Sequence, residues 1–138
     1  MTPDQIALVE DTVTSLDLDA LAADFYRRAF AADPALSAMF TTDPAVQRAR
    51  FGAELAEIVR SIRSLDSFST AAAALGARHA GYGVRPAHYR LMGAVLLEAL
   101  AAALDAGWTP EVADAWVLAY NLTAETMLIG ARGDRPRP

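Results

Sequence analysis

The sequence predicts an all-α protein that folds as a single domain. Apolar residues recur at three- and four-residue spacing along most of the chain, which is the period of an amphipathic helix. Capping residues followed by proline mark several helix starts, and no stretch alternates with period two for long enough to indicate a strand. A length of 138 residues, 54% of them hydrophobic, suits one sizeable core and is too short for two ordinary domains.

The N-terminal part of the chain predicts two helices. Thr2 and Gln5 can form a capping box with Pro3 in the first turn, and the helix they open is expected to end near Ser15. A second helix follows, capped by one of two aspartates and ending before an aspartate–proline pair. The residues concerned are Asp17, Asp19, Asp33 and Pro34.

Aspartate–proline pairs open the next two helices. Asp33-Pro34 begins a short helix that is expected to end near Phe40, and Asp43-Pro44 begins a longer one. The longer helix has a stripe at three–four spacing, formed by Phe51, Leu55, Ile58, Ile62 and Leu65. A loop is expected at residues 67–69.

Three helices are predicted in the second half. An alanine-rich run ends at Gly81, a long helix opens at Pro86, and a last helix opens at Pro110. The polar, proline-bearing segment 131–138 is expected to be a disordered tail, which leaves residues 1–130 as the single domain.

Composition excludes several classes of function. The net charge of −5 gives no general electrostatic reason to bind nucleic acid or an anionic membrane, and the lack of cysteine excludes disulfides and thiolate metal sites. The N-terminus lacks the pattern of a signal peptide, and the longest apolar stretch, residues 91–104, is interrupted by Glu98 and too short for a membrane span. A cytoplasmic protein is therefore expected.

His79 is the candidate metal ligand. It is one of two histidines and lies at the end of the alanine-rich helix, which Gly81 and Gly83 are expected to break. On a helix the carbonyl of Leu75 lies four residues back and can accept one ring N–H, which leaves the other nitrogen for a metal. A lone histidine in a helical core is more often structural, so these residues alone leave both interpretations open. His88 is interpreted as a partly exposed side chain in the first turn of its helix.

The order of the helices and several strings within them resemble the globin family, in particular bacterial single-domain haemoglobins and the haem domain of flavohaemoglobins. The resemblance covers roughly residues 3–130. The matching strings are Phe25-Tyr26-Arg27-Arg28-Ala29-Phe30, Pro34, Phe40, Gln47-Arg48, Arg78-His79, Arg85-Pro86-Ala87-His88-Tyr89, Asp114-Ala115-Trp116 and Tyr120.

This resemblance implies a three-over-three helical sandwich around haem b, with His79 as the iron ligand. Truncated two-over-two haemoglobins match less well, because this sequence has a full first helix and lacks their glycine pairs. The resemblance further implies haem contacts by Phe40, Phe51, Arg50, Val84 and Met92. Without the resemblance, the two phenylalanines are equally well explained as core and the arginine as a solvated side chain.

The resemblance also assigns roles around the bound gas. It implies that Tyr26 and Gln47 stabilise the ligand by hydrogen bonds, and whether either coordinates the iron stays open. Tyr89 corresponds to a tyrosine that orients the ligand histidine. The family's glutamate late in the last helix is replaced here by Ala131, which argues against a strongly electron-donating histidine.

The resemblance therefore implies a haem protein that binds oxygen, nitric oxide and carbon monoxide. Nitric oxide dioxygenase activity is expected with a separate reductase, since no glycine-rich nucleotide loop follows a strand in this sequence. The alternatives are a non-enzymatic oxygen carrier, storage protein or gas sensor, and a haem-free interaction module. The physiological gas and the oligomeric state stay open.

Overall fold

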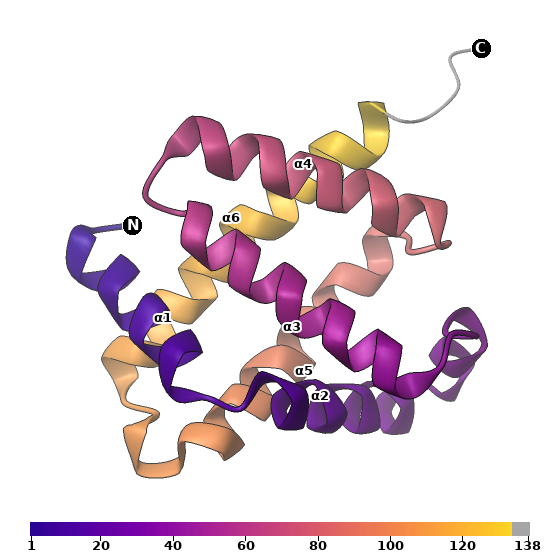
Figure 1. The fold of residues 1–138 in the computed structure, drawn as a ribbon, viewed down its shortest axis with the longest axis horizontal. Coiled ribbons are helices and arrows are strands. Elements are labelled where there is room, and N and C mark those ends of the chain that lie inside the picture. The colour runs from indigo at the N-terminus through magenta and orange to yellow at the C-terminus, as the bar shows by residue number, and fades with distance from the viewer. Residues whose placement is uncertain (134–138) are drawn as a thin grey trace.

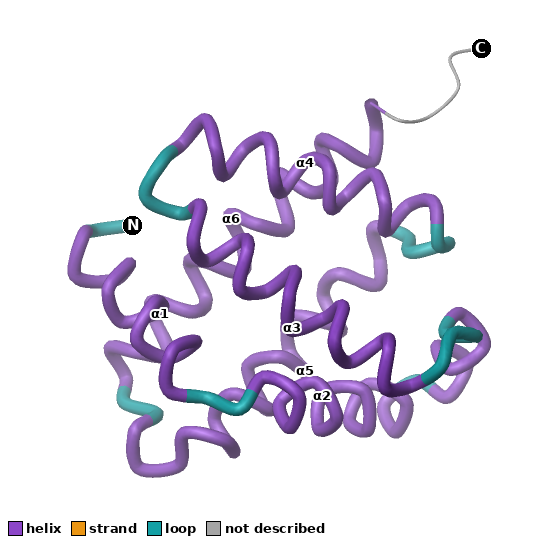
Figure 2. The backbone as a smooth tube through the Cα atoms, viewed as in Figure 1, coloured by secondary structure: helices purple, strands orange, loops and turns teal. Residues whose placement is uncertain are grey.

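The computed structural model describes residues 1–133, and within that range helices are joined by short loops (Figure 2). This confirms the predicted all-α class. The described elements, in order, are α1 (Pro3–Ser15), α2 (Leu18–Ala32), the 3-10 helix η1 (Pro34–Met39), α3 (Pro44–Ser61), α4 (Leu65–Gly81), α5 (Pro86–Leu104), the 3-10 helix η2 (Asp105–Gly107) and α6 (Pro110–Gly133) (Figure 1).

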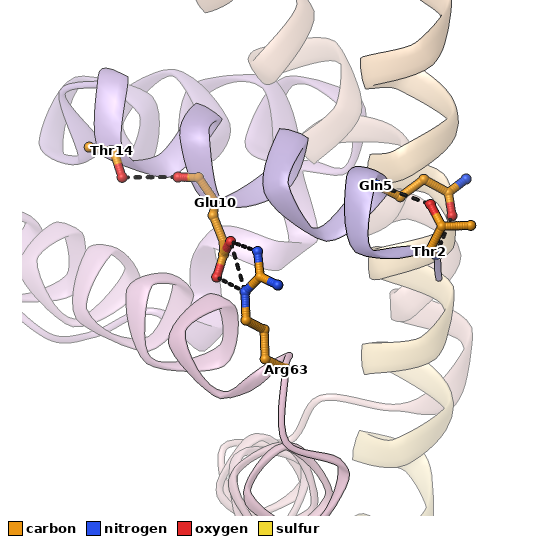
Figure 3. A network of polar contacts seen from close by, with 5 residues as sticks. All are labelled: Thr2, Gln5, Glu10, Thr14 and Arg63. Carbon is orange, nitrogen blue, oxygen red and sulfur yellow. Dashed lines mark hydrogen bonds and ion pairs between the residues drawn. The ribbon is translucent and has the colours of Figure 1, made fainter.

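The predicted caps begin these helices. Thr2 and Gln5 form the expected capping box, in which each backbone N–H donates to the other side chain, at 2.9 and 3.2 Å (Figure 3). Asp17, rather than Asp19, caps α2, because its carboxylate accepts two backbone N–H groups of the first turn. The two aspartate–proline pairs cap η1 and α3 as predicted, through Asp33 and Asp43.

The boundary between α3 and α4 differs from the prediction. The expected loop at residues 67–69 is wrong, because α3 ends at Ser61 and α4 has already begun at Leu65. The Ser64 hydroxyl accepts the backbone N–H of Ser67 and caps α4 there. Leu65 does not continue the apolar stripe of α3, since it is 74% exposed.

The last helix is longer than the sequence suggested. α6 runs to Gly133, three residues into the segment 131–138 that was expected to be a tail. Residues 134–138 lie outside the described part of the chain. Among residues 1–133, no helix combines the length and the apolar character needed to cross a membrane.

Two clusters of buried side chains form the core. The larger one joins α1, α2, α5 and α6 around Phe25, Leu100 and Trp116. The smaller one lies mainly between α4 and α6, around Phe68 and Met127. α3 crosses in front of α5 and α6, and α4 runs along the top of the view in Figure 1. Helices α3, α4, α5 and α6 therefore all contribute buried side chains to the interior.

α4 and α6 share the most extensive interhelical contact in the described structure. Two glycines allow their backbones to touch. A Cβ atom added to Gly76 of α4 would lie 1.9 Å from the carbonyl oxygen of Met127, and one added to Gly130 of α6 would lie 2.0 Å from that of Ala73. The position of α4, which carries His79, is thus fixed by backbone approach to α6.

Polar side chains connect α1 to the end of α3 and to α6. Glu10 forms an ion pair with Arg63, just beyond the end of α3, with a shortest distance of 2.6 Å (Figure 3). On the inner side of α1, the Trp116 indole N–H donates to the hydroxyl of buried Thr12 at 3.2 Å. That hydroxyl in turn donates to the Leu8 carbonyl at 2.8 Å, so both of its roles are used.

Replacing Thr12 by valine is expected to destabilise the fold by about 1–3 kcal/mol, because the buried indole N–H of Trp116 then loses its acceptor. Urea denaturation followed by tryptophan fluorescence measures the effect. Thr14→Val is the matched control: the Thr14 hydroxyl bonds its own helix in the same way, at 3.0 Å to Glu10, but is exposed. We expect the control to change stability by less than about 0.5 kcal/mol. Equal effects of the two variants would contradict the proposed role of the buried bond.

Candidate functional site

The cavity that His79 lines, called the main cavity below, lies between α3, α4, α5 and α6 and has a volume of about 140 Å³. Its wall is mostly apolar, which suits an apolar ligand with a few polar contacts. It reaches the surface, since Glu54 and His79 on its wall are only half-buried. The lining side chains with polar atoms are Glu54, His79, Tyr89, Trp116, Tyr120 and Thr123.

His79 presents one ring nitrogen that is chemically free to bind a metal. Its Nδ1 lies 2.9 Å from the Leu75 carbonyl oxygen, to which it donates as the sequence predicted. Nε2 of the neutral ring therefore keeps its lone pair. Burial lowers the pKa of His79 below its ordinary value, although the hydrogen bond to Leu75 opposes this shift. The neutral form, which is the form that binds metals, is thus favoured.

A tight turn after His79 reverses the chain into α5. Gly83 adopts a positive φ of 93°, a conformation that favours glycine. The backbone N–H of Val84 then donates to the His79 carbonyl at 3.0 Å, and the Val84 side chain packs against the smaller core cluster. At the start of α5, the Arg85 backbone N–H donates to Nδ1 of His88 at 2.9 Å, so the second histidine caps a helix.

Tyr89 places a buried hydroxyl beside the cavity. This hydroxyl has no hydrogen-bond partner among residues 1–133, and burial raises the pKa of Tyr89, so the phenol stays protonated. The neighbouring Tyr120 is not its partner, since the Tyr120 hydroxyl donates to the Tyr89 main-chain carbonyl at 2.5 Å. An unpaired buried hydroxyl costs about 1–3 kcal/mol, which makes Tyr89 a candidate to bond a group held in the cavity.

Tyr26 and Gln47 form a pair beside a second cavity of about 250 Å³, between α2, the loop that follows η1, and α3. Gln47 Nε2 lies 3.0 Å from the Tyr26 hydroxyl oxygen. The tyrosine oxygen accepts this bond, so its own proton can be donated elsewhere. Burial raises the pKa of Tyr26, which keeps that proton in place, and the bond from Gln47 opposes the shift.

Aromatic packing holds the Tyr26 ring in position. The rings of Phe40 and Phe51 meet it edge-on, with centroids 5.2 and 5.9 Å away. Phe51 also lines the main cavity, whereas Phe40 lines the second one. Phe51, like Phe25, therefore packs against Tyr26 and also lines the cavity of His79.

The structure divides the predicted site residues into three groups. His79, Tyr89, Phe51 and Met92 line the main cavity. Tyr26, Gln47 and Phe40 line the second cavity, so the two predicted hydrogen-bond donors do not share a cavity with His79. Arg50 and Val84 line neither; the Arg50 guanidinium lies 6.0 Å from the centre of the Tyr82 ring, and Val84 is in the turn after α4.

Glu54 is a cavity residue that the sequence reasoning missed. It follows Gln47 by seven residues and Phe51 by three, so all three share one face of α3. That spacing was the available signal. A glutamate on a helix is ordinarily solvated, and only the packing of α3 shows that this one borders the cavity.

These observations fit a bound group that is largely apolar and carries a metal. His79 offers a neutral nitrogen, Tyr89 offers an unpaired hydroxyl, and the remaining wall is mainly hydrocarbon. Haem has these properties, and the donor set of a single histidine is one that haem iron uses.

Comparisons with known proteins agree with this picture. The family model described as Globin matches residues 23–127. A flavohemoprotein from Deinococcus radiodurans is 32% identical over 137 residues, covering 93% of this chain and 33% of the relative. A protein named anaerobic nitrite reductase from Oryza sativa subsp. indica is 28% identical over 114 residues, covering 78% of this chain and 79% of the relative. This chain spans about a third of the length of the flavohemoproteins it matches.

Solved structures share the fold. A bacterial globin from Campylobacter jejuni superposes with a TM-score of 0.85 at 23% identity, covering 96% of this chain and 97% of the other. A proposed nitric oxide dioxygenase from Rhodothermus marinus, engineered as a carbene transferase, gives 0.85 at 24% identity, covering 96% and 94%. These likenesses confirm the predicted three-over-three helical arrangement.

Proposed function

Because this chain belongs to the globin family, we propose that it holds haem b through His79 and binds oxygen, nitric oxide and carbon monoxide. The observation that carries the proposal is the His79 ring, which lies in the cavity wall with Nδ1 bonded to Leu75 and Nε2 unprotonated. When bound, the haem iron would supply a coordination site for diatomic gases and a redox centre.

The chain's own residues have distinct parts in this proposal. Leu75 fixes the tautomer and orientation of His79, and the Tyr89 hydroxyl is available to the bound group. Phe51, Met92 and Phe40 supply apolar contact, with Val84 in the supporting turn. Arg50, whose guanidinium lies near the Tyr82 ring, is proposed to pair with a propionate of the bound haem.

Tyr26 is proposed as the donor that retains a gas ligand. The Gln47 amide donates to the Tyr26 hydroxyl oxygen. The proton of the Tyr26 hydroxyl is therefore directed away from Gln47. Phe51, which packs against Tyr26 and lines the main cavity, is proposed as the steric gate. A donor of this kind favours a ligand with partial negative charge and slows its release.

We further propose nitric oxide dioxygenase activity with electrons from a separate reductase. The reaction joins one nitric oxide, one oxygen molecule and one electron to give nitrate. The Tyr26–Gln47 pair supports it, as does similarity to flavohemoproteins and to a proposed nitric oxide dioxygenase. A non-enzymatic carrier, storage or gas-sensing role is the alternative, favoured by Ala131 in place of the family's glutamate. Fast oxygen release with negligible nitric oxide turnover would select the alternative.

Tyr26→Phe is expected to speed oxygen dissociation about 10- to 100-fold, because loss of a hydrogen bond to a partly charged ligand costs about 1.5–3 kcal/mol. Aerobic nitric oxide consumption with a surrogate reductase should fall in parallel. Stopped-flow absorbance and a nitric oxide electrode measure the two rates. Tyr82→Phe is the control, since it removes the same hydroxyl from a tyrosine that is 53% exposed. If wild type shows no haem-dependent consumption, the enzymatic proposal is wrong.

A further inference from the structure

Glu54 brings a carboxyl group to the wall of the main cavity. It is half-buried on α3 and is the only acidic residue among the residues that line this cavity in the described part of the chain. His79 of α4 and Tyr89 of α5 line the same space. A ligand that enters the cavity therefore meets one acidic side chain in otherwise mainly apolar surroundings.

Burial and two arginines act in opposite directions on the pKa of this carboxyl group, and the net effect is to raise it. Burial raises the pKa of Glu54, and the guanidinium groups of Arg78 and Arg50 oppose that shift. Neither arginine lines the cavity: Arg78 is exposed, and Arg50 lies against the Tyr82 ring. Water screens the positive charge of the exposed Arg78 more strongly than it screens a charge on the cavity wall. The charged group on the cavity wall itself is thus the Glu54 carboxylate, whereas the two guanidinium groups lie outside that wall.

We propose that Glu54 makes this cavity selective for neutral ligands over anionic ones. The inference rests on the proposed haem-dependent gas binding and defines its substrate class. Neutral diatomic gases do not pay an electrostatic penalty beside a carboxylate, whereas an anion such as azide or nitrite is repelled. The same repulsion favours release of nitrate, the anionic product of the proposed reaction.

The test compares an anionic and a neutral ligand on the same haem-loaded, ferric full-length protein. Azide and imidazole are titrated at neutral pH, and binding is followed by the shift of the Soret band. Glu54→Gln removes the charge and keeps the shape of the side chain. We expect this variant to bind azide about tenfold more tightly, which corresponds to about 1.4 kcal/mol, with imidazole affinity unchanged within about twofold.

Two further variants separate charge from disturbance of the fold. Glu57→Gln changes an exposed glutamate one turn along the same helix and is expected to leave both affinities within about twofold of wild type. Glu54→Asp keeps the charge and should retain most of the discrimination against azide. An effect of Glu57→Gln equal to that of Glu54→Gln would show only a general surface-charge effect and would overturn the inference.

The outcomes also distinguish this inference from the proposal beneath it. If the protein forms no Soret band, the haem proposal and this inference both fail. If haem binds normally and Glu54→Gln leaves the ratio of azide to imidazole affinity unchanged, this inference alone is wrong. If the ratio shifts as expected while nitric oxide is not consumed, the selectivity stands and the enzymatic proposal fails.

Discussion

His79→Ala is expected to lower haem affinity by about a hundredfold or more, since even the loss of groups that support a metal ligand costs 10- to 100-fold. The cavity wall offers no second imidazole, because the other histidine caps α5 with its Nδ1. Titration of the haem-free protein with haem, followed at the Soret band, measures the affinity. Imidazole added to the solution is expected to restore part of the spectrum by filling the space that the ring leaves.

His88→Ala is the matched control for this prediction. It removes the remaining histidine but touches only the cap of α5, where the Arg85 N–H loses its acceptor. We expect the Soret band to be unchanged and stability to fall by about 1 kcal/mol. Normal haem affinity in His79→Ala, or equal losses in both variants, would overturn the assignment of His79.

Gly76→Ala is expected to destabilise the protein by about 3 kcal/mol or more. The new methyl group would fall 1.9 Å from the Met127 carbonyl oxygen, and neither backbone can withdraw without separating α4 from α6. Gly130→Ala should act similarly, because its Cβ would lie 2.0 Å from the Ala73 carbonyl oxygen. Thermal unfolding followed by circular dichroism measures both, and the melting temperature should fall by about 10 °C or more.

Gly81→Ala provides the control on the same helix. A Cβ atom at Gly81 meets nothing within 4 Å, so the substitution adds only helix propensity at the C-terminal end of α4. We expect stability to stay within about 0.5 kcal/mol of wild type. A Gly76→Ala protein that melts at the wild-type temperature would show that α4 and α6 do not approach as closely as described.

The helices were largely predictable because their signals are local. The cap of α1 by Thr2 and that of α3 by Asp43 depend on residues two or three positions apart, and both formed as expected. The error at residues 67–69 arose where serines offered competing caps. Ser64 caps α4, while Leu65 matched the apolar spacing of α3 without belonging to it. Local spacing alone did not show where α3 ends.

Some features of the candidate site were predictable from the sequence and others were not. The resemblance named His79, and the helix alone places Leu75 four residues before it, within reach of the ring N–H. The division of the site into two cavities did not follow from the sequence, since it depends on how the Phe51 ring of α3 packs against Phe25 and Tyr26 of α2. Glu54 was overlooked for a related reason: a glutamate on a helix is usually solvated, and His79, which lines the same cavity, is 25 residues away in the sequence.

The sequence by itself determined the helical class, most helix starts and the hydrogen bond that orients His79, because each depends on contacts within about one helical turn. The tertiary structure decided which faces of the helices meet. Gly76 and Gly130 are two small residues in an alanine-rich sequence, and only the crossing of α4 and α6 shows that backbone contact requires them. The same crossing, with α3 packed alongside, places Glu54 in the wall of the His79 cavity, because side chains far apart in sequence come together only when the helices pack.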